Sequence, residues 1–219
     1  MDVDALINEY PFLYHMAEPD SWSSIRDNGL FSTTAILDRY RLTGMPRRRI
    51  EAEHRPEKVS LQDDRLGRIV IRDQKPMGEE RLRIALIDGT TPSEWYSYLN
   101  ARVFFWVSYD RLLGLLNARS YRREEHDVLK IQSEPLIRAH LNQIMLCHMN
   151  SGNTFPVPHR RGMDAFKTVA DYPVGVRSGR PKPAVVELTV EGSVLDIRRY
   201  VVEVNRMRGA EVISNVYRR

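Results

Sequence analysis

The chain has almost no cysteine, with Cys147 as the one thiol among 219 residues. A single cysteine excludes an internal disulfide and any zinc site built from several thiolates. Cys147 ends the apolar run 144–147, so we interpret it as a small core residue rather than a nucleophile. We therefore expect a reducing, cytoplasmic location.

Long apolar runs and metal-ligand patterns are also missing. No apolar stretch approaches the ~20 residues that span a bilayer, and the acidic first residues do not resemble a signal peptide, so we expect no membrane association. The six histidines are scattered, and we expect no metal. The chain contains no GxGxxG, Walker, HExxH or GxSxG motif, which argues against the nucleotide-binding, zinc-protease and serine-hydrolase sites that these motifs build.

Basic residues exceed acidic ones only slightly, 33 against 29, but arginines gather in short clusters at 47–49, 122–123, 160–161 and 218–219. Such clusters can contact the phosphates of nucleic acid or the pyrophosphate of a dinucleotide. Clusters on a solvated surface, balanced by nearby carboxylates, remain the alternative.

Apolar periodicity, caps and breakers indicate one α+β domain over residues 1–219. The expected helices cover 3–9, 22–28, 33–40, 46–53, 79–86, 92–99, 109–118 and 135–142. The expected strands cover 12–16, 68–72, 102–108, 128–131, 144–148, 184–190 and 200–204. Residues 55–64 are expected to form a loop, and the proline- and glycine-rich segment 150–183 a long ordered loop or lid. Because strands and helices do not alternate regularly, the pattern favours α+β over a doubly wound sheet.

The opening of the chain carries the first candidate site. His15 ends a short apolar strand, and Gly29, Ser32 and Thr33 follow a short helix. An imidazole and a serine or threonine hydroxyl can together hold a ligand hydroxyl. A structural histidine in the core is the alternative.

The aromatic string 104–106 carries the second candidate site. It follows a capped helix and a cationic position, and it could form a wall for a flat ring. Phe105, Trp106 and nearby Tyr109 are the candidates. The alternative is that these rings belong to the core.

Glu187 carries the third candidate site. A carboxylate inside an apolar strand costs folding free energy unless it is paired or faces a cleft. Glu203 is the alternative candidate for this carboxylate, because it lies in the similar string 200–204. Polar residues that follow two other strands could bind a ligand: Arg72 its phosphates, and Asn150 and Ser151 its hydroxyl or amide groups. Turn formation is the alternative for each of these.

A histidine strand, an aromatic strand and a glutamate strand, in this order over residues 13–190, resemble the motifs of ADP-ribosyltransferases, especially the DarT-like group. Similar strings also occur in an uncharacterised bacterial family. The resemblance implies a split, mixed β-sandwich with an N-terminal helical portion, built around an NAD cleft. NAD would be the co-substrate of a glycosyl-type transfer.

The resemblance also implies roles for the candidate residues. Glu187 and His15 would be catalytic, acting on the ribose next to nicotinamide. The cofactor contacts would come from His15, Ser32, Thr33, Arg72, Phe105, Trp106 and Tyr109. Arg47, Arg49 and Arg65 compete with Arg72 for the pyrophosphate.

The implied acceptor is a nucleic-acid base, a protein side chain or a small molecule, and the basic clusters favour single-stranded DNA or RNA. A toxin-like activity with an antitoxin or immunity partner would fit the same resemblance. The alternative is a non-catalytic module that binds NAD or nucleic acid on the same fold.

Overall fold

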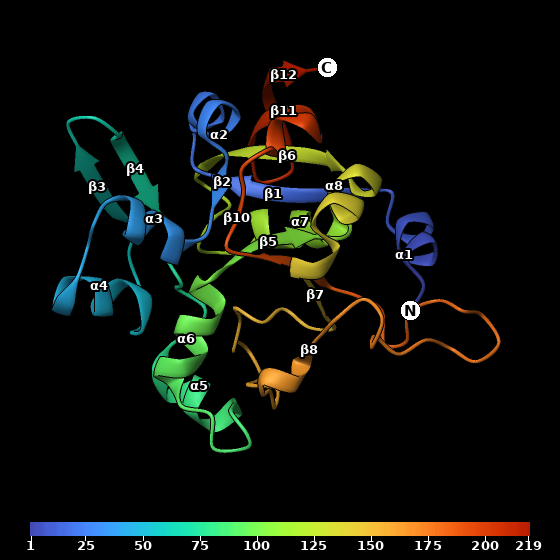
Figure 1. The fold of residues 1–219 in the computed structure, drawn as a ribbon. Helices are drawn as coiled ribbons and strands as arrows, with labels where there is room; N and C mark the ends of the chain where they lie inside the picture. The colour runs from blue at the N-terminus through green and yellow to red at the C-terminus, as the bar shows by residue number, and fades with distance from the viewer.

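One eight-stranded sheet organises the molecule (Figure 1), and the computed structural model describes all residues 1–219. Its strand order is β12-β11-β6-β1-β5-β9-β7-β8, and every neighbouring pair is antiparallel. These strands are β1 (Phe12–Ala17), β5 (Arg102–Trp106), β6 (Glu125–Gln132), β7 (Ile144–Cys147), β8 (Phe166–Lys167), β9 (Glu187–Glu191), β11 (Val201–Arg208) and β12 (Glu211–Arg218). The large antiparallel sheet confirms the α+β prediction over a doubly wound parallel sheet.

Eight α-helices surround the sheet, and they lie close to the predicted ranges. They are α1 (Val3–Glu9), α2 (Trp22–Asn28), α3 (Thr33–Arg39), α4 (Gly44–Glu51), α5 (Glu79–Ala85), α6 (Pro92–Asn100), α7 (Tyr109–Leu116) and α8 (Ser133–His140). Side-chain caps explain the agreement: Asp2 accepts from two amides at the start of α1, and Thr91 and Glu94 form a capping box at α6. None of the helices combines the length and apolar character needed to cross a bilayer.

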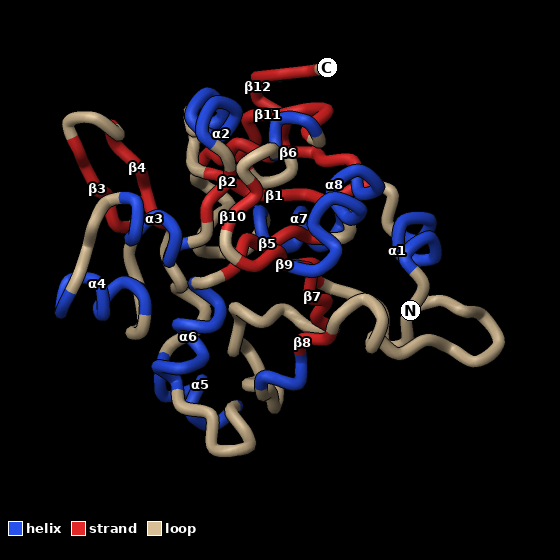
Figure 2. Tube along the Cα trace, in the orientation of Figure 1, coloured by secondary structure: helices blue, strands red, loops and turns tan.

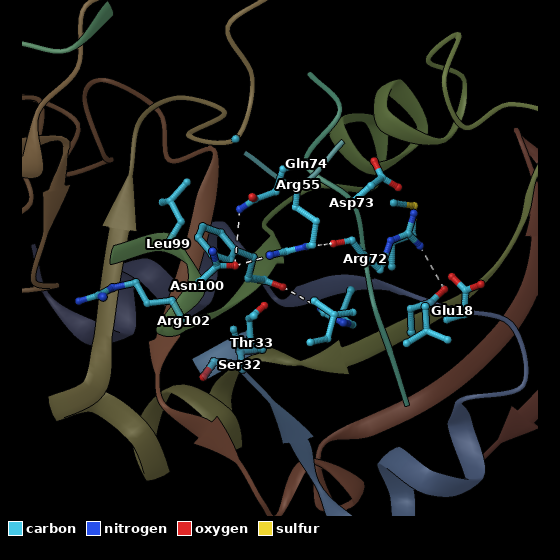
Figure 3. Close-up of a pocket in the computed structure, with 18 of the residues that line it drawn as sticks. Glu18, Ser32, Thr33, Arg55, Arg72, Asp73, Gln74, Leu99, Asn100 and Arg102 are labelled. Carbon is cyan, nitrogen blue, oxygen red and sulfur yellow. Dashed lines mark hydrogen bonds between the residues drawn. The ribbon is translucent and has the colours of Figure 1, made fainter. Parts of the chain in front are cut away.

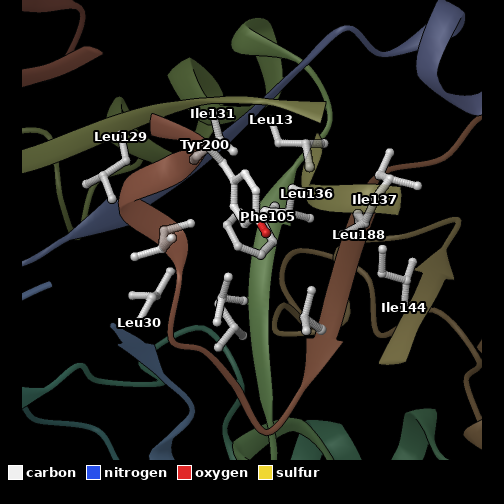
Figure 4. Close-up of a cluster of buried hydrophobic side chains, with 14 of the residues drawn as sticks. Leu13, Leu30, Phe105, Leu129, Ile131, Leu136, Ile137, Ile144, Leu188 and Tyr200 are labelled. Carbon is white, nitrogen blue, oxygen red and sulfur yellow. The ribbon is translucent and has the colours of Figure 1, made fainter. Parts of the chain in front are cut away.

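The two faces of the sheet are covered by different helices. One face carries the largest core cluster, 25 buried residues, part of which is drawn in Figure 4. Helices α1, α2 and α8 contribute Leu6, Ile25 and Leu136 to it. The opposite face packs against α7 through Leu112 and against α5 and α6 through a separate cluster.

The sheet is split between β1 and β5. These strands share a single register pair, Tyr14↔Trp106. Beyond it Met16 and Ala17 pair with β6 only, while Phe104 pairs with β9 only. One edge of each strand is therefore free of the neighbouring strand on the side where they diverge.

Short elements fill the region beside the split. The two-residue strands β2 (Leu30–Phe31) and β10 (Ser193–Val194) pair with each other. The Gly192 amide donates to Ala101 of the turn before β5 at 2.8 Å, and the Ser32 amide donates to Gly192 at 3.0 Å. Both short strands contact β5, so they support the edge of β5 that β1 leaves uncovered.

A hairpin of β3 (Val59–Asp63) and β4 (Gly67–Ile71) projects from the sheet with α3 and α4 (Figure 1). The prediction of a loop over 55–64 is wrong, because Val59 and Leu61 alternate with polar residues and pack with Ile69 around a small cluster. The strands β2, β8, β10 and β12 were not predicted either, and the first three of them are two residues long, too short to show a pattern.

The segment between β7 and β9 runs mostly without regular structure, as the tan tube of Figure 2 shows. It contains the 3₁₀ turn η2 (Met163–Ala165) and β8. Further 3₁₀ turns are η1 (Leu141–Gln143) and η3 (Ile197–Arg199). The irregular course agrees with the prediction of a long loop over 150–183.

Candidate functional site

A cavity of about 1760 Å³ opens where β1 and β5 diverge. This volume exceeds the ~300–1,000 Å³ of typical small-molecule pockets. Its lining includes His15, Trp106 and Glu187 from three adjacent strands, together with residues of α2, α3, β4 and the 150–155 segment. The three sequence motifs therefore meet at one cavity.

His15 bridges the split. Its Nδ1 lies 2.8 Å from the carbonyl oxygen of Phe104, and its ring lies 5.8 Å from that of Phe105. Burial lowers the pKa of His15 to about 4, and the nearby Arg72 acts in the same direction. The imidazole is therefore neutral at pH 7. Because a carbonyl can only accept, Nδ1 carries the hydrogen and Nε2 is left as a hydrogen-bond acceptor.

Glu187 opens β9 and is 4% exposed. The Ser151 amide lies 3.3 Å and 3.2 Å from its two carboxylate oxygens, and the Ser151 hydroxyl donates to Oε2 at 2.7 Å. Burial raises the pKa of Glu187 to about 7, against the lowering effect of the Ser151 hydrogen bonds and of Arg161. Glu187 is the register partner of Trp106, so both side chains point to the same face of the sheet.

His15 and Glu187 come from opposite faces of the sheet. Tyr14, Trp106 and Glu187 are register partners across three strands, and His15 follows Tyr14 on the other face. Both residues nevertheless line the cavity, because the split leaves an opening between β1 and β5. Only this divergence lets the two motifs share one space.

Arg72 follows β4 and reaches the split from the hairpin side. Its Nη1 lies 3.1 Å from Nδ1 of His126 and 3.5 Å from the Ala17 carbonyl oxygen. The guanidinium also lies over the Tyr121 ring, 5.6 Å from its centroid. Its Nη2 is buried without a hydrogen-bond partner. The guanidinium thus has a donor available for an anionic ligand in the cavity.

Ser32 and Thr33 line the cavity at the start of α3. The Ser32 hydroxyl oxygen accepts from the Ala35 amide at 3.2 Å and caps the helix. A cap uses the hydroxyl as an acceptor, so its hydrogen can still be donated to a ligand. Ser32 is 2% exposed, so its hydroxyl can donate only to a ligand group that enters the cavity and contacts Ser32 directly.

The three aromatic candidates have different places. Phe105 lines the cavity but is 1% exposed and belongs to the main core. Trp106 is half-buried and lines the cavity on the Glu187 side. The expectation for Tyr109 needs correction: it does not line the cavity, and its ring packs against Tyr14 at 5.4 Å on the face covered by α7.

The remaining candidate residues differ in their position relative to the cavity. Glu203 lies on β11 outside the cavity, where it forms an ion pair with Arg218 at 2.5 Å. Ser151 is fully buried and holds Glu187, so its role is to orient the carboxylate rather than to meet a substrate freely. Asn150 is half-buried and lines the cavity. Of the competing arginines, Arg47 is ion-paired with Glu51, at 2.7 Å.

A buried arginine that was not predicted from the sequence lies at the cavity wall. Arg55, within the segment expected to be loop, donates to the carbonyl oxygens of Ile50 and Arg72 and to Oδ1 of Asn100 (Figure 3). Burial lowers the pKa of Arg55 to about 10. It ties α4, β4 and α6 together at the cavity wall. No local signal marks it, because its three acceptors are set by tertiary packing.

Cys147 is buried, as expected, and burial raises the pKa of its thiol to about 12. No group of three histidine, cysteine, aspartate or glutamate side chains is arranged to hold a metal ion.

A comparison with curated proteins gave no match. The model of one family, DUF7002, described as a family of unknown function, matches residues 11–201. The match begins just before β1 and ends at the first residue of β11, so it spans the strands that carry His15, Trp106 and Glu187. Because the match covers most of the chain, this protein belongs to the DUF7002 family.

Proposed function

We propose that the protein is an NAD-dependent ADP-ribosyltransferase with an ADP-ribosyltransferase-like fold. The observation that carries the proposal is the meeting of His15 and Glu187 at one cavity. Their strands, β1 and β9, flank the aromatic strand β5, and the single register pair between β1 and β5 leaves the opening at which the two residues meet.

The residues fit an NAD molecule chemically. Nε2 of His15 can accept from a ribose hydroxyl, and Glu187 can accept from a neighbouring one. The exposed part of Trp106 offers an apolar surface to the nicotinamide ring. Arg72, with its unpartnered Nη2, suits the pyrophosphate. The cavity volume of about 1760 Å³ leaves space for an acceptor beside the dinucleotide.

NAD, when bound, supplies an ADP-ribosyl group joined to nicotinamide by a glycosidic bond, and positive charge develops on the ribose as that bond breaks. The Glu187 carboxylate is held by two donors of one residue, so it is oriented before the substrate arrives. A fixed anion next to a developing cation stabilises the transition state more than the ground state. Neutral His15 positions the ribose without adding a competing positive charge.

The charge at the cavity rim bears on the acceptor. Arg39, Arg65 and Arg68 line the cavity, and none of them forms an ion pair with a carboxylate in this structure. Guanidinium groups left free of carboxylates can meet nucleic-acid phosphates. We therefore favour a base of single-stranded DNA or RNA as the acceptor.

Nicotinamide release from NAD tests the proposal, with wild type, Glu187→Gln and the matched control Glu203→Gln. We expect Glu187→Gln to lower the rate roughly a hundredfold, which corresponds to ~3 kcal/mol of transition-state stabilisation. Glu203→Gln should keep the wild-type rate, because Glu203 lies outside the cavity.

Calorimetry with NAD distinguishes the proposed transferase from the alternative, a non-catalytic NAD-binding module. We expect binding by wild type and by Glu187→Gln, and its loss in His15→Ala, with His159→Ala as an exposed control. Binding without nicotinamide release, with every acceptor class tried, would favour a non-catalytic NAD-binding module. Absence of NAD binding in wild type would refute the NAD-dependent function itself.

A further inference from the structure

Arg161 is a buried cation that forms no ion pair. It is 2% exposed, although its neighbour Arg160 is exposed. Its Nη1 donates to the carbonyl oxygens of Ser151 at 3.0 Å and Asn150 at 3.4 Å, and its Nε donates to that of His159 at 3.0 Å. One guanidinium thus joins both ends of the loop 152–160.

The Ser151 backbone is fixed from several directions. Its carbonyl oxygen accepts from Arg161 and lies 3.4 Å from the indole nitrogen of Trp95, which is fully buried. The amide and hydroxyl of the same residue donate to Glu187. Arg161 therefore acts on Glu187 through one residue, with Ser151 holding the guanidinium on one side and the carboxylate on the other.

The backbone of Arg161 is anchored as well. Its amide donates to Ala85 at 2.8 Å, and its carbonyl oxygen accepts from Ile87 at 3.0 Å, so it is tied to the end of α5. The loop that it closes faces the cavity through Gly152, Asn153 and Phe155, whereas Arg161 does not line the cavity. An effect of Arg161 on chemistry in the cavity must therefore pass through Ser151 and Glu187.

We propose that Arg161 is a positioning residue that orients Glu187 through Ser151, with the same guanidinium holding the two ends of the loop 152–160 together. The inference deepens the proposed function and rests on it for the role of Glu187. A substrate group that contacts Asn153 or Phe155 would act on the same loop whose base holds the carboxylate.

The other groups around Glu187 do not replace Arg161. Arg111 of α7 also lowers the pKa of Glu187, to a smaller extent, and its side chain is exposed. Cys147 is the register partner of Glu187 on β7, and its raised pKa keeps it neutral. Arg161 is the buried cation with the largest effect on this carboxyl.

The test follows the titration of the Glu187 carboxyl by ¹³C NMR, with the signal assigned by its loss in Glu187→Gln. In Arg161→Gln we expect the midpoint to rise by about one pH unit, because a favourable charge and an oriented donor are lost. Arg160→Gln removes the same charge from the adjacent exposed position, and it should leave the midpoint unchanged.

Kinetics supply the second readout. In Arg161→Gln, kcat for nicotinamide release should fall about tenfold with KM for NAD near the wild-type value, and Arg161→Lys should recover part of it. Arg161→Lys, which changes the geometry of the donors, should also raise the midpoint and keeps the inference testable if Arg161→Gln fails to fold. Ser151→Ala removes only the hydroxyl donor to Glu187, and it should raise the midpoint through the second step of the chain.

The failures of the two proposals differ. A midpoint unchanged in folded Arg161→Gln, or in Arg161→Lys where Arg161→Gln does not fold, overturns the positioning role. Wild type that releases no nicotinamide overturns the proposed function, whereas the titration still decides whether Arg161 orients the carboxylate.

Discussion

Glu187 combines burial with hydrogen bonding in a way that costs folding free energy at neutral pH. Two Ser151 donors favour its charged form, yet burial outweighs them and raises its pKa to about 7. Functional groups are often held in such unfavourable states because the surrounding structure keeps them there. We therefore expect one substitution, Glu187→Gln, to raise the stability of the protein at neutral pH and to lower its activity.

The stability of Glu187→Gln should depend on pH relative to wild type. The carboxyl has an ordinary pKa of 4.5 in the unfolded chain and about 7 in the folded one, so the folded state binds the proton more tightly. Wild-type stability therefore falls as pH rises from 4.5 to 7, by about 3 kcal/mol at most. We expect Glu187→Gln to gain stability over wild type at pH 8 and to lose most of that gain at pH 5.

Urea denaturation at the two pH values measures this difference. Glu203→Gln serves as the control, because Glu203 lies outside the cavity and forms an ion pair with Arg218 at the edge hairpin of the sheet. A stability difference between Glu187→Gln and wild type that is the same at pH 5 and pH 8 would contradict the burial of a titrating carboxyl.

The junction between α2 and β2 depends on one glycine. Gly29 ends α2 with φ of +101°, and a Cβ placed there would lie 2.7 Å from Cα of Leu195. This close approach lets the segment after β10 pack against the helix that precedes Ser32. The position of the β2–β10 pair, and with it the wall of the cavity, therefore requires a residue without a side chain.

Gly29→Ala should destabilise the protein by roughly 2–4 kcal/mol, because it adds backbone strain and a clash with backbone atoms. Gly114→Ala is the matched control: Gly114 lies within α7, and a Cβ there meets no atom within 4 Å. That substitution should stabilise the helix by up to ~1 kcal/mol. Thermal unfolding of the two variants checks both signs, and equal melting temperatures would refute the expectation.

At the scale of the whole molecule, the cavity is lined by the split sheet together with α3 and β4, which belong to the hairpin–helix unit of α3, α4, β3 and β4 that projects from the sheet (Figure 1). Figure 3 draws part of this lining. The cationic rim comes from this unit, with Arg39 at the end of α3 and Arg65 and Arg68 at the hairpin. The modest net charge of +4 conceals this local concentration. Association with an anionic polymer should therefore be local and sensitive to salt.

Single-stranded oligonucleotides should bind at low salt, with an affinity that falls steeply as salt rises. Replacing Arg39, Arg65 and Arg68 by alanine should weaken binding and reduce the logarithmic salt slope by about 2, at roughly 0.7 per phosphate contact on single strands. The control replaces the exposed Arg177, Arg198 and Arg199, which do not line the cavity. Fluorescence anisotropy across salt concentrations measures both; equal slopes would place the polymer elsewhere or point to another acceptor class.

The sequence alone determined the features that depend on neighbours within one turn or strand. The caps at Asp2 and Thr91 marked α1 and α6, and apolar runs marked β1, β5 and β9. Their signals are local, since caps and strand alternation involve residues a few positions apart. A carboxylate in an apolar strand likewise identified Glu187 as unusual before any contact was known.

Only the tertiary structure separated residues that look alike in the sequence. Arg160 and Arg161 are adjacent, yet one is exposed and the other is buried against carbonyl oxygens. Glu187 and Glu203 occupy similar strings, yet only Glu187 reaches the cavity. These differences follow from strand order and from the divergence of β1 and β5, which join residues about 90 positions apart. Such long-range pairing leaves no trace in local periodicity, because it is decided by how the elements pack together.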